Sequence, residues 1–310
     1  HDGRELASSD RYGVWFWDAE TGTLKDRLRG RIAVGYVPDG DRFVSLTPRQ
    51  RVAIHNRGDG SEEVFDGFDI DLIPRLPSHD DPGPVVEADD PDAHFKIATT
   101  GAPVRGVTRD GGYVLVDQIG WNLTRGFDLT SKDTFELGRH EDYWSSQLLA
   151  YSPSGEFILY RTSVFDDPVR LLLRDIGNDD KWTEMPIPER LRGNVVFLPD
   201  ERRVACLIDD KNARSLAIID LTNPDETATR VALDGQHDFF DIAPLAVAAD
   251  GNLLAVGSGS EVLVFNAETL EEADRFRGHH GDVTALAFSP DGQRLASSDK
   301  TSILIWDLTR

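Results

Sequence analysis

The apolar positions of this chain fall in short runs that are each followed by polar turn residues. Such runs occupy residues 32–37, 195–198 and 245–248, and a second run follows a turn at 42–46 and at 156–160. Short apolar runs bounded by turn residues are typical of buried strands. Helix signals are weak along the whole chain. The pattern therefore predicts an all-β protein.

Two marks recur along the chain in a fixed order. The turn mark is Asp-Gly or a close variant after an apolar run, a pair that suits hairpins because glycine accepts positive φ. It lies at Asp2-Gly3, Asp39-Gly40, Asp110-Gly111, Ser154-Gly155, Asp200-Glu201, Asp250-Gly251 and Asp291-Gly292. The strand-end mark lies at Trp17-Asp18, Ile54-His55, Phe127-Asp128, Arg174-Asp175, Ile219-Asp220, Phe265-Asn266 and Trp306-Asp307. Steps of about 40 residues between marks are the period of a four-stranded propeller blade.

One step between marks is longer than the others, at about 71 to 73 residues against about 37 to 50. The extra length lies in residues 57–102, which are rich in proline and in acidic residues. This is turn and loop composition. It predicts an outer strand followed by a loop insertion, and a degenerate extra blade is the alternative.

The two ends of the chain are pieces of the same repeat. Residues 278–307 contain L-A-S-S-D followed by W-D, and residues 1–18 contain the same two segments at identical spacing, from Leu6 to Trp17 and from Leu295 to Trp306. Self-similarity at a fixed period is the sequence signature of a repeat architecture. Function in such proteins lies on surfaces, so no catalytic motif is expected.

With these repeats the sequence resembles the WD-repeat family of β-propellers, strongly at both ends and in degenerate form between them. The resemblance implies one propeller domain over residues 1–310, with seven blades of four-stranded antiparallel sheets, that acts as a binding platform for other proteins. Residues 151–160 look equally like the repeats of TolB-type periplasmic propellers. A TolB-like propeller therefore remains an alternative, and so does a propeller enzyme with its active site at the central channel.

The family's structural tetrad of His, Ser, Asp and Trp can be placed on both terminal repeats. Buried polar groups between strands need hydrogen-bond partners, which is the physical reason for such a set. In the last blade the matching residues are His279, Ser297 or Ser298, Asp299 and Trp306. In the first blade they are Ser8 or Ser9, Asp10 and Trp17. The same Ser, His and Asp could be read as a hydrolase triad, but the chain has no G-x-S-x-G elbow.

Both terminal blades are predicted to be incomplete. Residue 1 falls inside the turn motif, and the last blade stops at its third strand. An open sheet edge exposes pairing groups. We therefore expect the parent protein to continue in both directions, as a larger bacterial protein with this propeller as its regulatory or docking domain.

The formal net charge of −22 limits the classes of partner. Binding of nucleic acid or of an anionic membrane requires a basic surface, so neither is expected. The acidic run at 87–94 lacks the spacing of a calcium loop, and the single cysteine excludes a thiolate zinc site, so no metal or cofactor is expected. No apolar run reaches transmembrane length. No small-molecule substrate is evident, and the expected location is the cytoplasm.

Candidate protein-binding residues lie in two loops that lead into inner strands. Exposed aromatic residues beside charges are typical of protein-binding hot spots. The candidates are Asp142, Tyr143, Trp144, Asp238, Phe239 and Phe240. The alternative is that Trp144 and Phe240 point inward and pack the blades. The sequence thus predicts a non-catalytic scaffold for protein–protein interaction.

Overall fold

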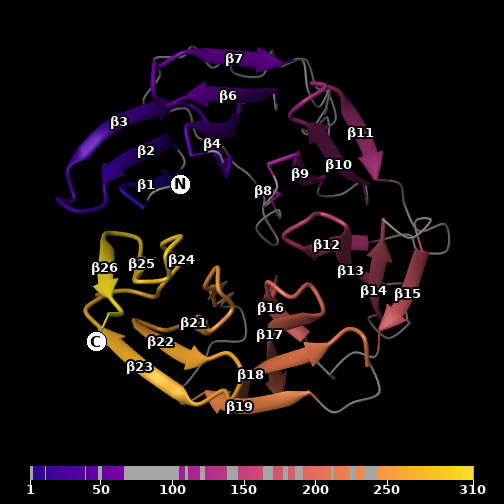
Figure 1. Cartoon of the computed structure of the whole chain (residues 1–310). Coiled ribbons are helices and arrows are strands. Elements are labelled where there is room, and N and C mark those ends of the chain that lie inside the picture. The colour runs from indigo at the N-terminus through magenta and orange to yellow at the C-terminus, as the bar shows by residue number, and fades with distance from the viewer. Residues whose placement is uncertain are drawn as a thin grey trace, which may run out of the picture. The chain divides into compact units, whose positions relative to one another are not determined.

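The computed structural model describes residues 3–10, 12–38, 40–47, 51–65, 105–108, 111–118, 123–137, 146–162, 170–176, 181–185, 191–210, 213–223, 228–233 and 243–309. Within these ranges the regular structure consists of 26 strands, without a helix (Figure 1). The all-β class predicted from the apolar runs is therefore confirmed.

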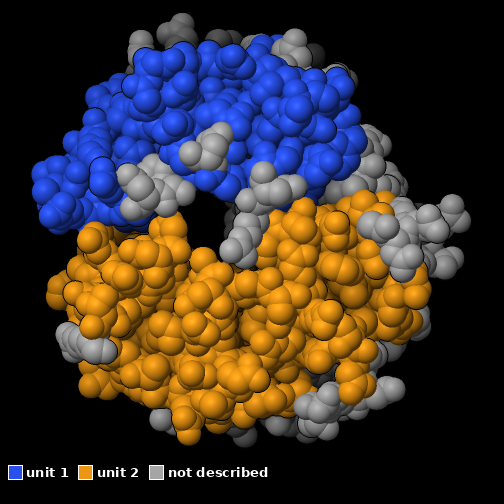
Figure 2. All heavy atoms as spheres, in the orientation of Figure 1, with its two compact units in different colours: residues 1–139 blue, residues 140–310 orange. Residues whose placement is uncertain are grey.

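The chain forms two compact units, His1–Arg139 and His140–Arg310, which are coloured separately in Figure 2. The first unit contains three sheets among its described residues, and in each sheet consecutive strands pair antiparallel. They are β1 (Glu5–Asp10), β2 (Gly13–Asp18) and β3 (Leu24–Arg29); β4 (Ile32–Tyr36), β5 (Arg42–Leu46), β6 (Val52–Asn56) and β7 (Glu62–Phe65); and β8 (Arg105–Val107), β9 (Tyr113–Gln118), β10 (Leu123–Asp128) and β11 (Thr134–Leu137).

The second unit contains four sheets of the same antiparallel kind among its described residues. They are β12 (Ser146–Tyr151), β13 (Phe157–Thr162), β14 (Arg170–Asp175) and β15 (Lys181–Met185); β16 (Leu191–Phe197), β17 (Arg203–Asp210), β18 (Ala213–Asp220) and β19 (Thr229–Leu233); β20 (Leu245–Val247), β21 (Leu253–Ser258), β22 (Glu261–Asn266) and β23 (Glu272–Arg277); and β24 (Ala285–Phe288), β25 (Arg294–Ser298) and β26 (Ile303–Asp307).

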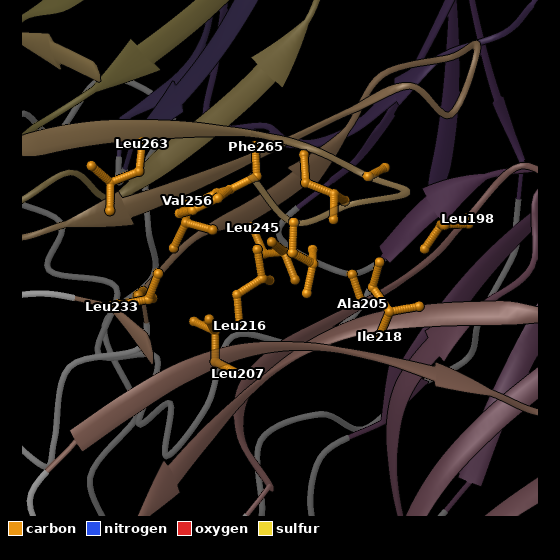
Figure 3. Packing of buried hydrophobic residues seen from close by; sticks show 14 residues of the cluster. Leu198, Ala205, Leu207, Leu216, Ile218, Leu233, Leu245, Val256, Leu263 and Phe265 are labelled. Carbon is orange, nitrogen blue, oxygen red and sulfur yellow. The ribbon is translucent and has the colours of Figure 1, made fainter. Parts of the chain in front are cut away.

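The hydrophobic core of each unit lies between the faces of neighbouring sheets. Leu207 and Leu216 of the fifth sheet pack against Val256 and Phe265 of the sixth (Figure 3). Both faces of a middle sheet are covered in this way, so its central strands have apolar residues at successive positions instead of alternating ones. In β22, for example, Val262 to Phe265 are all buried. This explains why the strands appear in the sequence as continuous apolar runs.

The described residues form seven antiparallel meanders, which are the blades of a β-propeller, as the repeat predicts. From the second sheet to the seventh, the turn marks connect the first and second strands, and the strand-end marks lie at the end of the third strand or one residue before it. In the first sheet the turn mark precedes β1, and the strand-end mark lies at the end of β2. Five blades have four strands, whereas the first and the last have three each within the described residues. The outer strand predicted after residue 57 is β7. Residues 66–104 lie outside the described ranges, so a loop and an extra blade both stay open there, and the single domain over 1–310 stays a prediction.

Glu201 departs from the turn mark because it occupies the position that is glycine in the other six marks. Its φ of 58° lies in the left-handed region, which costs a residue with a Cβ about 1 kcal/mol. Its carboxylate accepts hydrogen bonds from the backbone N–H of Ser154 at 2.7 Å and from the Ser154 hydroxyl at 2.6 Å. Glu201 therefore links the turn of the fifth sheet to the turn of the fourth.

We expect Glu201→Ala to lower the free energy of unfolding by about 1 to 2 kcal/mol, because it loses both hydrogen bonds and keeps the unfavourable φ. Glu201→Gly should be less destabilising than Glu201→Ala by about 1 kcal/mol, because glycine relieves the strain. Urea denaturation of both variants measures the difference. Equal stability of the two variants would contradict this account of the turn.

Candidate functional site

The polar residues predicted for the last blade are brought together in one hydrogen-bonded chain. The Trp306 indole N–H donates to Ser297 Oγ at 2.7 Å. Ser297 Oγ lies 2.6 Å from His279 Nε2, and His279 Nδ1 lies 3.3 Å from Asp299 Oδ2. If the indole donates to Ser297, the Ser297 hydroxyl is free to donate to His279 Nε2, and the proton on Nδ1 then faces the carboxylate. Each polar atom of the chain has a partner.

Asp299 is held by the turn between β25 and β26. Its Oδ1 accepts the backbone N–H groups of Thr301 at 2.7 Å and Ser302 at 2.6 Å, and its Oδ2 accepts those of His280 and Gly281 at 3.2 and 3.3 Å. These hydrogen bonds, that from the Thr301 N–H foremost, hold the pKa of Asp299 well below its usual value. An aspartate that is ionised and bound in this way fixes a turn and is a poor proton acceptor.

The chain of polar groups is closed to a substrate. His279, Ser297 and Asp299 are buried, with 7%, 2% and 8% of their surfaces exposed. The indole of Trp306 stacks on Phe276 with a centroid distance of 4.8 Å and covers one side of the group. A nucleophilic serine must reach the carbonyl that it attacks. The geometry therefore favours a packing role over a hydrolase triad.

The first sheet repeats half of this arrangement. The Trp17 indole N–H donates to Ser8 Oγ at 2.8 Å, and Asp10 Oδ1 accepts the backbone N–H groups of Tyr12 and Gly13. Ser9 is exposed. In the last sheet Ser298 likewise lies outside the chain of polar groups, with its Oγ 3.3 Å from that of Thr284. The sequence did not decide between Ser8 and Ser9 or between Ser297 and Ser298. In the structure the tryptophan indole donates to Ser8 in the first sheet and to Ser297 in the last.

A third member of this set was missed in the sequence, in the second sheet. Ser45 Oγ lies 2.8 Å from His55 Nε2, and both side chains are buried. Ser45 of β5 and His55 of β6 occupy the places of Ser297 and Trp306, since His55 pairs with Phe43 as Trp306 pairs with Leu295. The strand-end mark read as Ile54-His55 is one residue early, because the register aligns His55 with Trp306 and Asn56 with Asp307.

The six candidate protein-binding residues lie outside the described residues, in 138–145 and 234–242, so their role stays a prediction. The described part of the second unit has a hollow of about 180 Å³ between the turns of the fifth and sixth sheets, lined by Asp200, Asp250 and Glu268 among others. Arg203 already bridges Asp200 and Glu268, at 2.6 and 2.8 Å. We assign no ligand to this hollow.

In the part of the chain that the structure describes, no three or more His, Cys, Asp or Glu side chains form a metal-binding group. Cys206 is fully buried in β17, and burial raises the pKa of its thiol to about 12. Such a thiol is unreactive at neutral pH. The described residues include no helix that is long and apolar enough to span a membrane.

The sequence model of the family described as WD domain, G-beta repeat matches residues 271–307. This confirms the resemblance to the WD-repeat family at the C-terminal repeat. Among curated proteins, the chain is 38% identical over 65 residues to a 66 kDa stress protein of Physarum polycephalum, which is 20% of this chain and 11% of that protein. It is 31% identical over 71 residues to Pre-mRNA-processing factor 19 homolog 2 of Arabidopsis thaliana, 23% of this chain and 14% of that protein.

A WD repeat-containing protein of Synechocystis sp. is 30% identical over 112 residues, 35% of this chain and 30% of that protein. The chain thus spans less than a third of each of these relatives. Among solved structures, the hydrazine synthase of Kuenenia stuttgartiensis matches with a TM-score of 0.67 and 16% identity, over 99% of this chain and 93% of that one. The Cps50 (Swd1) β-propeller domain of Myceliophteria thermophila matches with a TM-score of 0.63 and 15% identity, over 99% and 94%. These likenesses show the fold alone.

Proposed function

We propose that this β-propeller, with its WD repeat at residues 271–307, is a non-catalytic platform for protein–protein interaction, and that it serves as the docking or regulatory domain of a larger bacterial protein. The observation that carries the proposal is the chain from Trp306 to Asp299. Its serine, histidine and aspartate are all buried and bound to one another, so they act in packing and leave recognition to the surface.

The charge of the chain supports a particular kind of partner. A net charge of −22 repels nucleic acid and anionic lipid and attracts proteins with a basic surface. WD-repeat propellers typically bind other proteins, and two of the relatives are pre-mRNA-processing factors by name. We infer that the partner is a protein with a basic surface. Binding of nucleic acid, membrane or a small-molecule substrate is not part of the proposed function. The proposed location is the cytoplasm.

The experiment that tests this function compares partner capture by the intact chain and by a variant with Trp144→Ala and Phe239→Ala. We expect the double variant to lose the captured partner and to keep the melting temperature of the original chain, because hot-spot aromatic residues contribute most of the binding energy. A matched control changes the exposed Tyr12 to Ala, far in the sequence from both loops. Loss of stability without a specific loss of capture would mean that the two aromatic residues pack the blades.

A further inference from the structure

His55 stands where the repeat has tryptophan, and it differs from tryptophan in one property that matters here. In the first and last sheets an indole N–H donates to the serine of the neighbouring strand, at 2.8 and 2.7 Å. In the second sheet the imidazole Nε2 of His55 makes the same contact with Ser45 at 2.8 Å. An indole carries its proton at every physiological pH, whereas an imidazole gains a second proton near neutrality.

His55 lies beside residues that pack the first sheet against the second. Its cross-strand neighbour Phe43 packs edge to face on Phe16 of β2, with a centroid distance of 4.9 Å. Arg57, two residues after His55, lies over the Phe16 ring at 3.6 Å. The side chain of His55 is 5% exposed, so a charge on its ring would be buried beside this aromatic cluster.

Charged groups reach His55 from several elements, and they act in opposite directions. Glu62, its cross-strand partner on β7, places Oε2 3.6 Å from Nδ1, and Asp26 of β3 adds a second carboxylate. These two carboxylates favour the protonated ring. Two cations oppose protonation: Arg57 and Arg31, which precedes β4 and binds Glu62. Burial is the largest influence and also opposes protonation, so the pKa of His55 lies below its ordinary value of about 6.5.

We propose that His55 makes the packing of the first two sheets sensitive to pH. With a neutral ring it replaces the tryptophan of the repeat, and protonation of the ring weakens the contact. A protonated ring keeps a donor for Ser45, but it also adds a buried positive charge near Arg31 and Arg57 and competes with Arg31 for Glu62. The first unit would then open more readily in acid, whereas the indole–serine hydrogen bonds of the first and last sheets do not titrate.

The direction of the effect follows from proton binding. Because the folded state disfavours the charged ring, the unfolded chain binds more protons at mildly acidic pH. The stability contributed by the neutral ring is therefore full above pH 6.5 and declines as the pH falls from there towards the pKa of the folded state. Below that pKa no further loss comes from this residue.

Hydrogen exchange of the full chain at about pH 7.5 and about pH 5.5, corrected for intrinsic exchange rates, tests the proposal. We expect the protection of β1, β2, β5 and β6 to fall at the lower pH, by at most about tenfold, because pH 5.5 lies about one unit below the ordinary pKa of histidine. His55→Gln keeps an N–H donor for Ser45 without titrating, and it should remove most of this fall. His280→Gln, at an exposed histidine, should leave the fall unchanged.

Two results would overturn the proposal. One is an equal loss of protection in His55→Gln and in the original chain. The other comes from NMR titration of the His55 ring in the intact chain, which does not depend on any variant folding. A midpoint at or above the ordinary value of about 6.5 would mean that the fold does not resist protonation there.

Discussion

Replacing Arg57 with alanine is expected to lower the free energy of unfolding of the first two sheets by about 2 to 4 kcal/mol. The guanidinium of Arg57 forms two parallel hydrogen bonds with Glu5 of β1, both at 3.1 Å, and a third with Asp26 of β3 at 2.8 Å. It also covers the Phe16 ring. One side chain from the second sheet thus binds two strands of the first.

Most of the expected loss in the free energy of unfolding comes from Glu5, because its side chain is only 12% exposed. Without Arg57 it keeps the hydroxyl of Tyr36, which donates to Glu5 Oε1 at 2.7 Å, but loses the guanidinium. A carboxylate left without its cation in a largely buried place is strongly destabilising. Asp26 is half exposed and adds little, although its hydrogen bond from Arg57 lowers the pKa of its carboxyl.

Chemical denaturation of the full chain, with hydrogen exchange to locate the loss in β1, β2, β5 and β6, measures the effect. Arg277→Ala is the matched control, because Arg277 also pairs with a glutamate, Glu261, but is 70% exposed. Exposed pairs contribute at most about 1 kcal/mol. Arg57→Lys keeps the charge and loses the two-point contact, so an intermediate loss is expected. An effect of Arg57→Ala no larger than that of Arg277→Ala would contradict the assignment.

The seven-fold repeat was predictable from the sequence because turns depend on local chemistry. Asp-Gly turns and strand ends recur once in each blade, and from the second sheet to the seventh each falls at its expected place or within one residue of it. The polar chain of the last blade was predictable for the same reason, since four residue types stand at the spacing of the repeat. The choice between Ser297 and Ser298 was not predictable, because both lie in one strand and only the pairing of β25 with β26 decides which faces Trp306.

Contacts between blades were the part that the sequence did not reveal. Arg57 and Glu5 are 52 residues apart, and Glu201 and Ser154 are 47 apart. Neither pair recurs with the period of the repeat, because each contact is made at only one place in the chain. The role of His55 was missed for a different reason. A histidine can make the same contact with serine as a tryptophan does, so the second blade lacks the tryptophan by which the motif is recognised in the sequence. The degenerate middle of the chain is therefore where new chemistry was easiest to miss.

Replacing Ser297 with alanine is expected to lower the free energy of unfolding of the second unit by about 2 to 4 kcal/mol, the other large effect. Ser297 Oγ is the single atom that contacts both the Trp306 indole N–H and His279 Nε2. In Ser297→Ala the indole N–H of Trp306 and Nε2 of His279 both lose this hydroxyl, next to the packed rings of Phe276 and Trp306. Each unsatisfied buried group costs about 1 to 3 kcal/mol.

Ser298→Ala is the matched control, one residue away on the same strand, and should cost less than about 0.5 kcal/mol because its hydroxyl lies in the exposed pair with Thr284. Urea denaturation of each full chain, with hydrogen exchange on β24 to β26, measures both. The double variant with Ser297→Ala and Trp306→Phe should cost less than the sum of the single changes, because the two residues share one hydrogen bond. Additive effects, or equal losses from Ser297→Ala and Ser298→Ala, would show that the polar chain does not hold the last blade together.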